Sequence, residues 1–169
     1  KTTLIQDLQH QLPGLEIHPR FCTSKGGPID GLAEAVFRGV RSTPTNYIYD
    51  RHPIISEYVY RTAIPGQVIP DVFLSDAMGR IRKRIARHSL VIWCLPPLSS
   101  VKNNVERDAE GEMPGVVENI EEIYRQYLMH KQMWPGRHAT YDYTRSAASW
   151  EDLKYVLSDT LNTLWRTNA

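Results

Sequence analysis

The chain has 169 residues, of which 41% are hydrophobic and 23% are charged, a composition typical of a globular protein with one hydrophobic core. Its formal net charge of +1 at pH 7 argues against a broad electrostatic surface for nucleic acid polymers, and no apolar run is long enough to cross a membrane. The two cysteines, Cys22 and Cys94, lie far apart in apolar surroundings. We interpret them as reduced thiols of a cytoplasmic protein.

The first predicted element is a helix that begins directly after Lys1-Thr2-Thr3 and has its apolar positions at Leu4, Ile5, Leu8 and Leu12. Lys-Thr is the end of the pattern G-x-x-x-x-G-K-[ST], in which backbone N–H groups surround a di- or triphosphate, the lysine contacts the β/γ-phosphates and the hydroxyl binds Mg²⁺. In such proteins a helix follows the loop directly, and the apolar pattern after Lys1-Thr2-Thr3 fits such a helix. On its own, this short match is weak.

Short strands and helices then alternate along the chain. We predict a strand over residues 15–22, a helix over 32–37, a strand over 47–49 and a helix after Pro53, since proline suits a first helical turn. The later elements are a helix over 71–87 with Phe73, Ala77, Ile81 and Ile85 buried, a strand over 90–95, helices over 100–107 and 117–129, a strand over 140–143, and a closing helix over 150–164. This alternation predicts an α/β fold with a parallel sheet.

A second chemical signal is Asp50-Arg51-His52, which follows the strand over residues 47–49. Open parallel sheets bind ligands beyond the carboxyl ends of their strands, so these side chains are expected in a binding crevice. A carboxylate there can hold Mg²⁺ or accept a proton from a hydroxyl, and a guanidinium can bind a phosphate. The alternative is a carboxylate that caps the next helix beside a surface arginine.

These residues resemble those of a known family. Asp50-Arg51-His52-Pro53, the strand and turn over 91–97, and the helix and loop that follow look like the P-loop nucleoside and nucleotide kinases, and most of all like the thymidylate-kinase-like group, which includes deoxynucleoside monophosphate kinases of bacteriophages. The resemblance covers almost the whole chain. It implies one kinase domain over residues 1–169 with the three-layer P-loop fold, in which helices flank a parallel sheet.

By this resemblance, Lys1 is the P-loop lysine and Thr2 the Mg²⁺-binding hydroxyl, with Thr3 beside them at the ATP. Asp50 would organise Mg²⁺ and the attacking oxygen, while Arg51 would bridge the donor and acceptor phosphates. The implied cofactors are therefore ATP and Mg²⁺.

Arg20 resembles the arginine that meets the acceptor phosphate, and its alternative is a surface arginine. Tyr58 is placed to contact the nucleoside, and its alternative is a tyrosine buried in its helix. The resemblance also puts adenine near residues 141–144.

A lid is expected over residues 108–115, flanked by Lys102 and Arg107. A lid arginine would neutralise charge on the transferring phosphoryl group and exclude water on closure. Arg107 is the preferred candidate because it lies where helix gives way to loop, and Arg125 on the following helix is the substitute. Since several acidic residues surround Arg107, a solvated charged turn remains the alternative. The basic helix face formed by Arg80, Arg84 and Arg87 is interpreted as solvated.

The glycine-rich half of the phosphate-binding loop, and the strand before it, do not precede Lys1 in the printed sequence. We therefore expect the chain to be a fragment of a longer gene product. The segment over residues 20–50 is also short for a thymidylate kinase, which leaves the acceptor base open.

The function predicted from these features is ATP-dependent phosphoryl transfer to a (deoxy)nucleoside monophosphate, which forms the diphosphate. The alternatives are a deoxynucleoside kinase, in which Asp50 would be the general base for the 5′-hydroxyl, and a non-catalytic nucleotide-binding domain of the same fold. The expected partners are small-molecule nucleotides, with no nucleic acid polymer and no membrane. Homodimer formation is possible. The expected location is the cytoplasm, or the host cytoplasm if the protein is viral.

Overall fold

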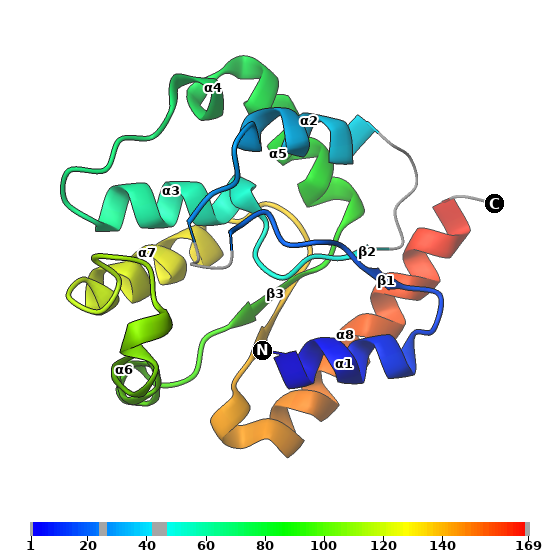
Figure 1. Ribbon diagram of the computed structural model, residues 1–169. Coiled ribbons are helices and arrows are strands. Elements are labelled where there is room, and N and C mark those ends of the chain that lie inside the picture. The colour runs from blue at the N-terminus through cyan, green and yellow to red at the C-terminus, as the bar shows by residue number, and fades with distance from the viewer. Residues whose placement is uncertain (1, 24–26, 42–46, 168–169) are drawn as a thin grey trace.

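The computed structural model describes residues 2–23, 27–41 and 47–167. Figure 1 shows helices arranged around short parallel strand pairs. Strand β1 (Glu16–Ile17) pairs with β2 (Tyr47–Ile48), and β3 (Val91–Cys94) pairs with β4 (His138–Tyr141), both in parallel. The fold is therefore mixed α/β with small parallel sheets, which agrees with the class predicted from the sequence.

Helices make up most of the described residues and separate these strands. In chain order they are α1 (Thr2–Gln11), α2 (Leu32–Arg41), α3 (Pro53–Ala63), α4 (Asp71–Leu74), α5 (Asp76–His88), α6 (Leu98–Arg107), α7 (Ile120–Gln132) and α8 (Ser146–Thr167), with short 3-10 turns η1 (Ala109–Gly111) and η2 (Tyr143–Arg145). None of the helices within this description combines the length and apolarity needed to cross a bilayer.

Strand β3 has helices on both of its faces because its side chains alternate between them. Trp93 is buried in a core with residues of α3, α5 and α7. Its neighbours Ile92 and Cys94 pack instead against a core built from α1, β4 and α8. Both faces of β3 are covered, as the unbroken apolar run predicted. Pro96-Pro97 follows and ends the strand.

Two predicted strands are shorter or shifted in the structure. In the stretch 15–22 the ladder covers only Glu16–Ile17 and one further bond from His18 N to Ile48 O, because Pro19 has no N–H to donate. The last strand is His138–Tyr141 rather than 140–143. Asp142 ends it by accepting hydrogen bonds from the N–H and hydroxyl of Thr144.

The helix predicted over residues 71–87 is divided at Ser75 into α4 and α5. Ser75 has an extended backbone, and its hydroxyl accepts a hydrogen bond from Met78 N at 3.3 Å, so it is the N-cap of α5. Phe73 and Met78 are buried on the two sides of this break. The basic residues of α5 that we interpreted as solvated, Arg80, Arg84 and Arg87, are exposed.

Candidate functional site

A cleft of about 210 Å³ lies beyond the carboxyl end of β2. Three segments far apart in the sequence form its walls: the loop after β1, the turn into α3 with the helix itself, and the segment after η1. Its lining side chains belong to Phe21, Cys22, Pro28, Asp50, Arg51, Pro53, Ser56, Glu57, Tyr60, Arg61, Gln67, Glu112, Met113 and Val116. This is the crevice position that the strand-end rule predicts for Asp50 and Arg51.

Asp50 is a charged side chain with little access to water. Only 8% of its side chain is exposed, and its Oδ2 lies 2.5 Å from Nη2 of Arg20, whose own side chain is 60% exposed. A carboxylate removed from water needs such a partner, because an unpaired buried charge is costly. The pair places Arg20 beside Asp50, although Arg20 itself is not among the residues that line the cleft.

Arg51 has a backbone φ of +66°, the only positive φ at a non-glycine residue in the described ranges. This left-handed conformation costs about 1–3 kcal/mol and often occurs at functional sites. It turns the chain from β2 into α3 and leaves the Arg51 side chain lining the cleft, with its guanidinium carbon 6.0 Å from the centre of the Tyr60 ring. Asp50 and Arg51 thus line the cleft together, and Asp50 is the shared electrostatic neighbour of Arg51 and Arg20.

His52 fixes the start of α3. Its Nδ1 accepts a hydrogen bond from Ile54 N at 3.3 Å, and Pro53 occupies the first helical turn. The imidazole packs edge-on against Phe21 and Tyr49. Burial, and to a lesser degree repulsion from His18, lowers the pKa of His52 to about 4, so the ring is neutral at pH 7 and Nδ1 can act as the acceptor.

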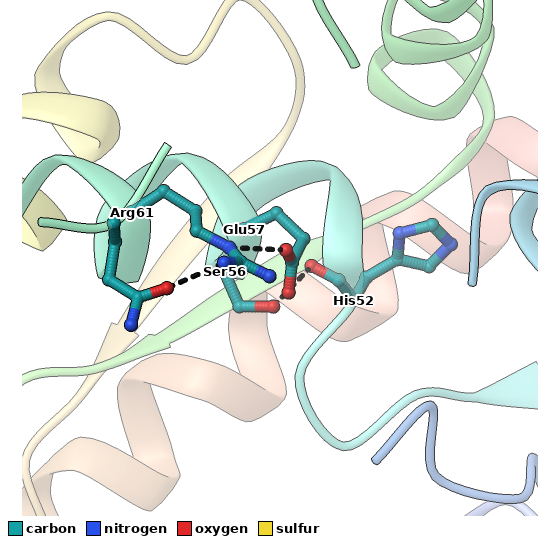
Figure 2. Close-up of polar contacts among 5 residues, drawn as sticks. His52, Ser56, Glu57 and Arg61 are labelled. Atoms are coloured by element: carbon teal, nitrogen blue, oxygen red, sulfur yellow. Dashed lines mark hydrogen bonds and ion pairs between the residues drawn. The ribbon is translucent and has the colours of Figure 1, made fainter. Parts of the chain in front are cut away.

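Helix α3 presents a polar face to the cleft. Figure 2 shows Glu57 and Arg61 joined along the helix, and Ser56 bonded to the carbonyl of His52. The Nε of Arg61 donates to Oε2 of Glu57 at 3.2 Å, and Nη1 donates to Oε1 of Gln67 at 2.5 Å. Glu57, Arg61 and Gln67 all line the cleft and are joined by these two hydrogen bonds, and we call them the polar chain.

Tyr58, which the resemblance implies as a nucleoside contact, does not line this cleft. Its hydroxyl donates to the carbonyl oxygen of Phe73, and Arg82 lies over its ring, 5.7 Å from the centre. The physical reason is the helical period of 3.6 residues, which points Tyr58 toward α4 and α5 while Tyr60 and Arg61 point into the cleft. Tyr58 therefore packs between helices, which is the alternative given for it in the sequence analysis.

The cationic lid candidates lie outside the cleft in the described structure. Arg107 is exposed and pairs with Asp108 at 3.2 Å, Lys102 pairs with Glu121, and Arg125 pairs with Glu122 at 2.6 Å. Of these, Arg107 interacts electrostatically with Tyr143 in η2, just beyond β4.

Only the second half of the expected lid segment, residues 108–115, reaches the cleft. Its first part, η1, is exposed, whereas Glu112 and Met113 line the cleft. Gly115, at φ +85°, packs closely against Ile64, and its carbonyl accepts a hydrogen bond from Asn119 Nδ2 at 2.8 Å.

The residues predicted to bind ATP are only partly within the description. Lys1 lies outside the described residues, and Thr2 is described only as the first residue of α1. Thr3 lines a second, shallower hollow of about 270 Å³ with Leu4, Asn104, Tyr141 and Tyr143. The amino end of α1 therefore lies beside the carboxyl end of β4, where the resemblance puts adenine.

The described fold is similar to that of a protein of known structure. The chain is similar in fold to the YorR protein of Bacillus subtilis. The two structures superpose with a TM-score of 0.63 over 93% of this chain and 88% of YorR, at 18% sequence identity, a level at which the likeness concerns the fold alone. The YorR structure is a complex with phosphorylated GDP. No protein family model matches the sequence, and no curated protein matches it.

The polar chain on α3 is the part of the cleft that sequence reasoning missed. A signal was present: Ile55, Val59 and Ala63 repeat every four residues and are buried. That stripe puts Glu57 and Arg61, themselves four apart, on a different face of the helix. The loop after β1 and the segment after η1 leave this face partly open to the cleft, and that packing cannot be read from the sequence.

Proposed function

We propose that this chain is a P-loop kinase domain that transfers the γ-phosphoryl group of ATP to a (deoxy)nucleoside monophosphate. The observation that carries the proposal is that Asp50 and Arg51 line a cleft directly beyond a parallel strand, with Arg20 paired to Asp50. Phosphoryl transfer requires mainly positioning and charge neutralisation. Two arginines around one carboxylate at a cleft are suited to both.

The fold likeness adds support. YorR has a similar arrangement of elements and holds a phosphorylated guanosine nucleotide, so a chain with this fold can present a nucleotide site. The helices on both faces of β3 also agree with the layered P-loop kinase fold. We extend the same proposal to the site residues that the sequence suggests: Lys1, Thr2 and Thr3 at the ATP, and Arg107 at the lid.

The residues present suit Mg²⁺ held largely by substrate. Among the described residues, no group of three or more acidic, histidine or cysteine side chains gathers as a metal site. Mg²⁺ in kinases commonly takes one or two carboxylates, water and substrate phosphates, and Asp50 and Thr2 are the residues that the resemblance offers for it. When bound with ATP, the ion would neutralise charge on the phosphates. Asp50 would help to hold it, and Arg51 would orient the acceptor.

The alternative of a deoxynucleoside kinase is less well supported. A nucleoside carries no phosphate, so Arg51 and Arg20 would have only the protein's own carboxylates, Asp50 and Glu112, as anionic neighbours. A monophosphate gives Arg20 and Arg51 a ligand that a planar guanidinium recognises well.

A substrate panel tests the proposal. The protein would be incubated with ATP, Mg²⁺ and each common nucleoside or nucleoside monophosphate, and products would be separated by ion-exchange chromatography. We expect consumption of at least one monophosphate and of no nucleoside. Consumption of nucleosides alone would replace the proposal with the nucleoside kinase, and binding without turnover of any acceptor would favour the non-catalytic domain.

A further inference from the structure

The polar chain of Glu57, Arg61 and Gln67 has unused hydrogen-bonding capacity inside the cleft. Arg61 carries five N–H groups, and the bonds to Glu57 and Gln67 use only Nε and Nη1. Within the described residues, neither Nη2 of Arg61 nor Oε1 of Glu57 has a hydrogen-bond partner. The cleft wall therefore offers a strong donor directly beside a strong acceptor.

An ion pair at this position is not explained by stability alone. The side chains of Arg61 and Glu57 are only 24% and 13% exposed, so both lose much of their hydration. Pairs that are partly removed from water give little net stability, because the desolvation cost offsets the attraction. A ligand that used the remaining donor and acceptor would recover that cost.

The pair also lines the same cleft as Asp50 and Arg51. Glu57 and Arg61 lie about one and two turns beyond the start of α3, and the guanidinium carbon of Arg51 is 6.0 Å from the centre of the ring of Tyr60, the residue before Arg61. A ligand with its phosphate at Arg51 and Arg20 would bring its base to Glu57 and Arg61.

We propose that Glu57 and Arg61 recognise the nucleobase of the acceptor, and that the base is guanine. The inference rests on the proposed function, because it takes the acceptor to be a nucleoside monophosphate. Guanine carries an oxygen at O6 next to two N–H donor positions, N1 and N2. Arg61 Nη2 donates to O6, as guanidinium groups do in DNA recognition, and the Glu57 carboxylate accepts from N1–H and N2–H.

The other bases satisfy this pair less completely. Thymine offers one N–H between two oxygens, so the carboxylate gains one donor and faces a second acceptor. Adenine and cytosine offer a single amino group, and the carboxylate again gains donors from only one position. A partly desolvated carboxylate left without its full set of donors loses binding free energy.

The test compares dGMP with dIMP, which lacks only the 2-amino group, by isothermal titration calorimetry on the full chain. We expect dGMP to bind about 10- to 100-fold more tightly, which is the effect of one hydrogen bond to a charged group. In the Glu57→Ala variant that ratio should fall to about 1, since the acceptor is gone. The ratio is measured within each variant, so a change in overall stability does not affect it.

Glu34→Ala is the matched control. Glu34 also pairs with an arginine four residues on, Arg38, at 2.7 Å, but on the exposed surface of α2. It should keep the full dGMP to dIMP ratio.

Tighter binding of dAMP, dCMP or dTMP than of dGMP, or an unchanged ratio in Glu57→Ala, would overturn the inference while leaving the proposed kinase intact. If no monophosphate binds, the proposed function fails and the inference fails with it.

Discussion

The lowered pKa of His52 makes the stability of the α3 start depend on pH. The folded protein holds His52 at a pKa of about 4, against an ordinary value of 6.5, because burial disfavours the charged imidazole. The unfolded chain therefore takes up a proton as the pH falls below 7, while the folded protein does not. The stability contributed by the neutral ring is complete above pH 7 and is lost progressively down to pH 4.

The size of this loss follows from the two pKa values. Linkage between them gives about 2 kcal/mol of unfolding free energy lost between pH 7 and pH 5, with most of the remainder lost by pH 4 and the rest below it. His130, whose pKa is also lowered by burial and by Arg82, adds a loss of the same sign. A comparison with a variant that changes only His52 is therefore needed.

His52→Asn is the variant of choice because asparagine is a good N-cap residue and does not titrate in this range. Urea unfolding followed by circular dichroism at pH 7, 6 and 5 would give the free energy of unfolding of both proteins. We expect the wild type to lose about 2 kcal/mol more than His52→Asn between pH 7 and pH 5. If the free energy of unfolding of the two proteins changed equally with pH, the lowered pKa of His52 would be refuted.

Three further predictions concern the cleft, the packing and the lid. Arg51→Ala should lower kcat of the proposed kinase by at least about 100-fold with an unchanged circular dichroism spectrum; near-normal turnover in the substrate panel would remove Arg51 from the mechanism. Gly136→Ala should destabilise by about 3 kcal/mol or more, because its Cβ would lie 2.2 Å from the backbone oxygen of Ala86. Gly79→Ala, in the first turn of α5 and with nothing within 4 Å of the added Cβ, should instead stabilise by about 0.5 kcal/mol, and urea unfolding of the two variants decides both. A bisubstrate analogue should slow proteolytic cleavage within residues 108–115, whose first part is exposed; equal cleavage rates with and without the analogue would argue against closure.

The sequence was most informative where a single local rule decides the outcome. The alternation of helices and strands predicted parallel pairing, and the apolar run containing Trp93 predicted a strand covered on both faces. The position of Asp50 and Arg51 in a crevice followed from their place after a strand. Each of these depends on neighbours in the chain rather than on the packing of distant segments.

The rest depended on contacts that local patterns do not specify. Tyr58 and Tyr60 are two residues apart in one helix, and only the packing of α4 and α5 decides which of them points away from the cleft. The break at Ser75 is similar, because a serine inside an apolar periodic run is compatible with both a continuous helix and a cap. Its hydroxyl bond to Met78 decides between them.

The left-handed backbone of Arg51 has an evolutionary consequence. Glycine adopts φ near +66° without strain, so Arg51→Gly would remove a backbone strain of about 1–3 kcal/mol. Part of that gain, about 0.5–1 kcal/mol, is offset because glycine gives the unfolded chain more conformational freedom. Selection for folding stability alone would therefore favour glycine at this position. An arginine at this position is what we expect if the proposed ligand binding, and not folding stability, is the property under selection here.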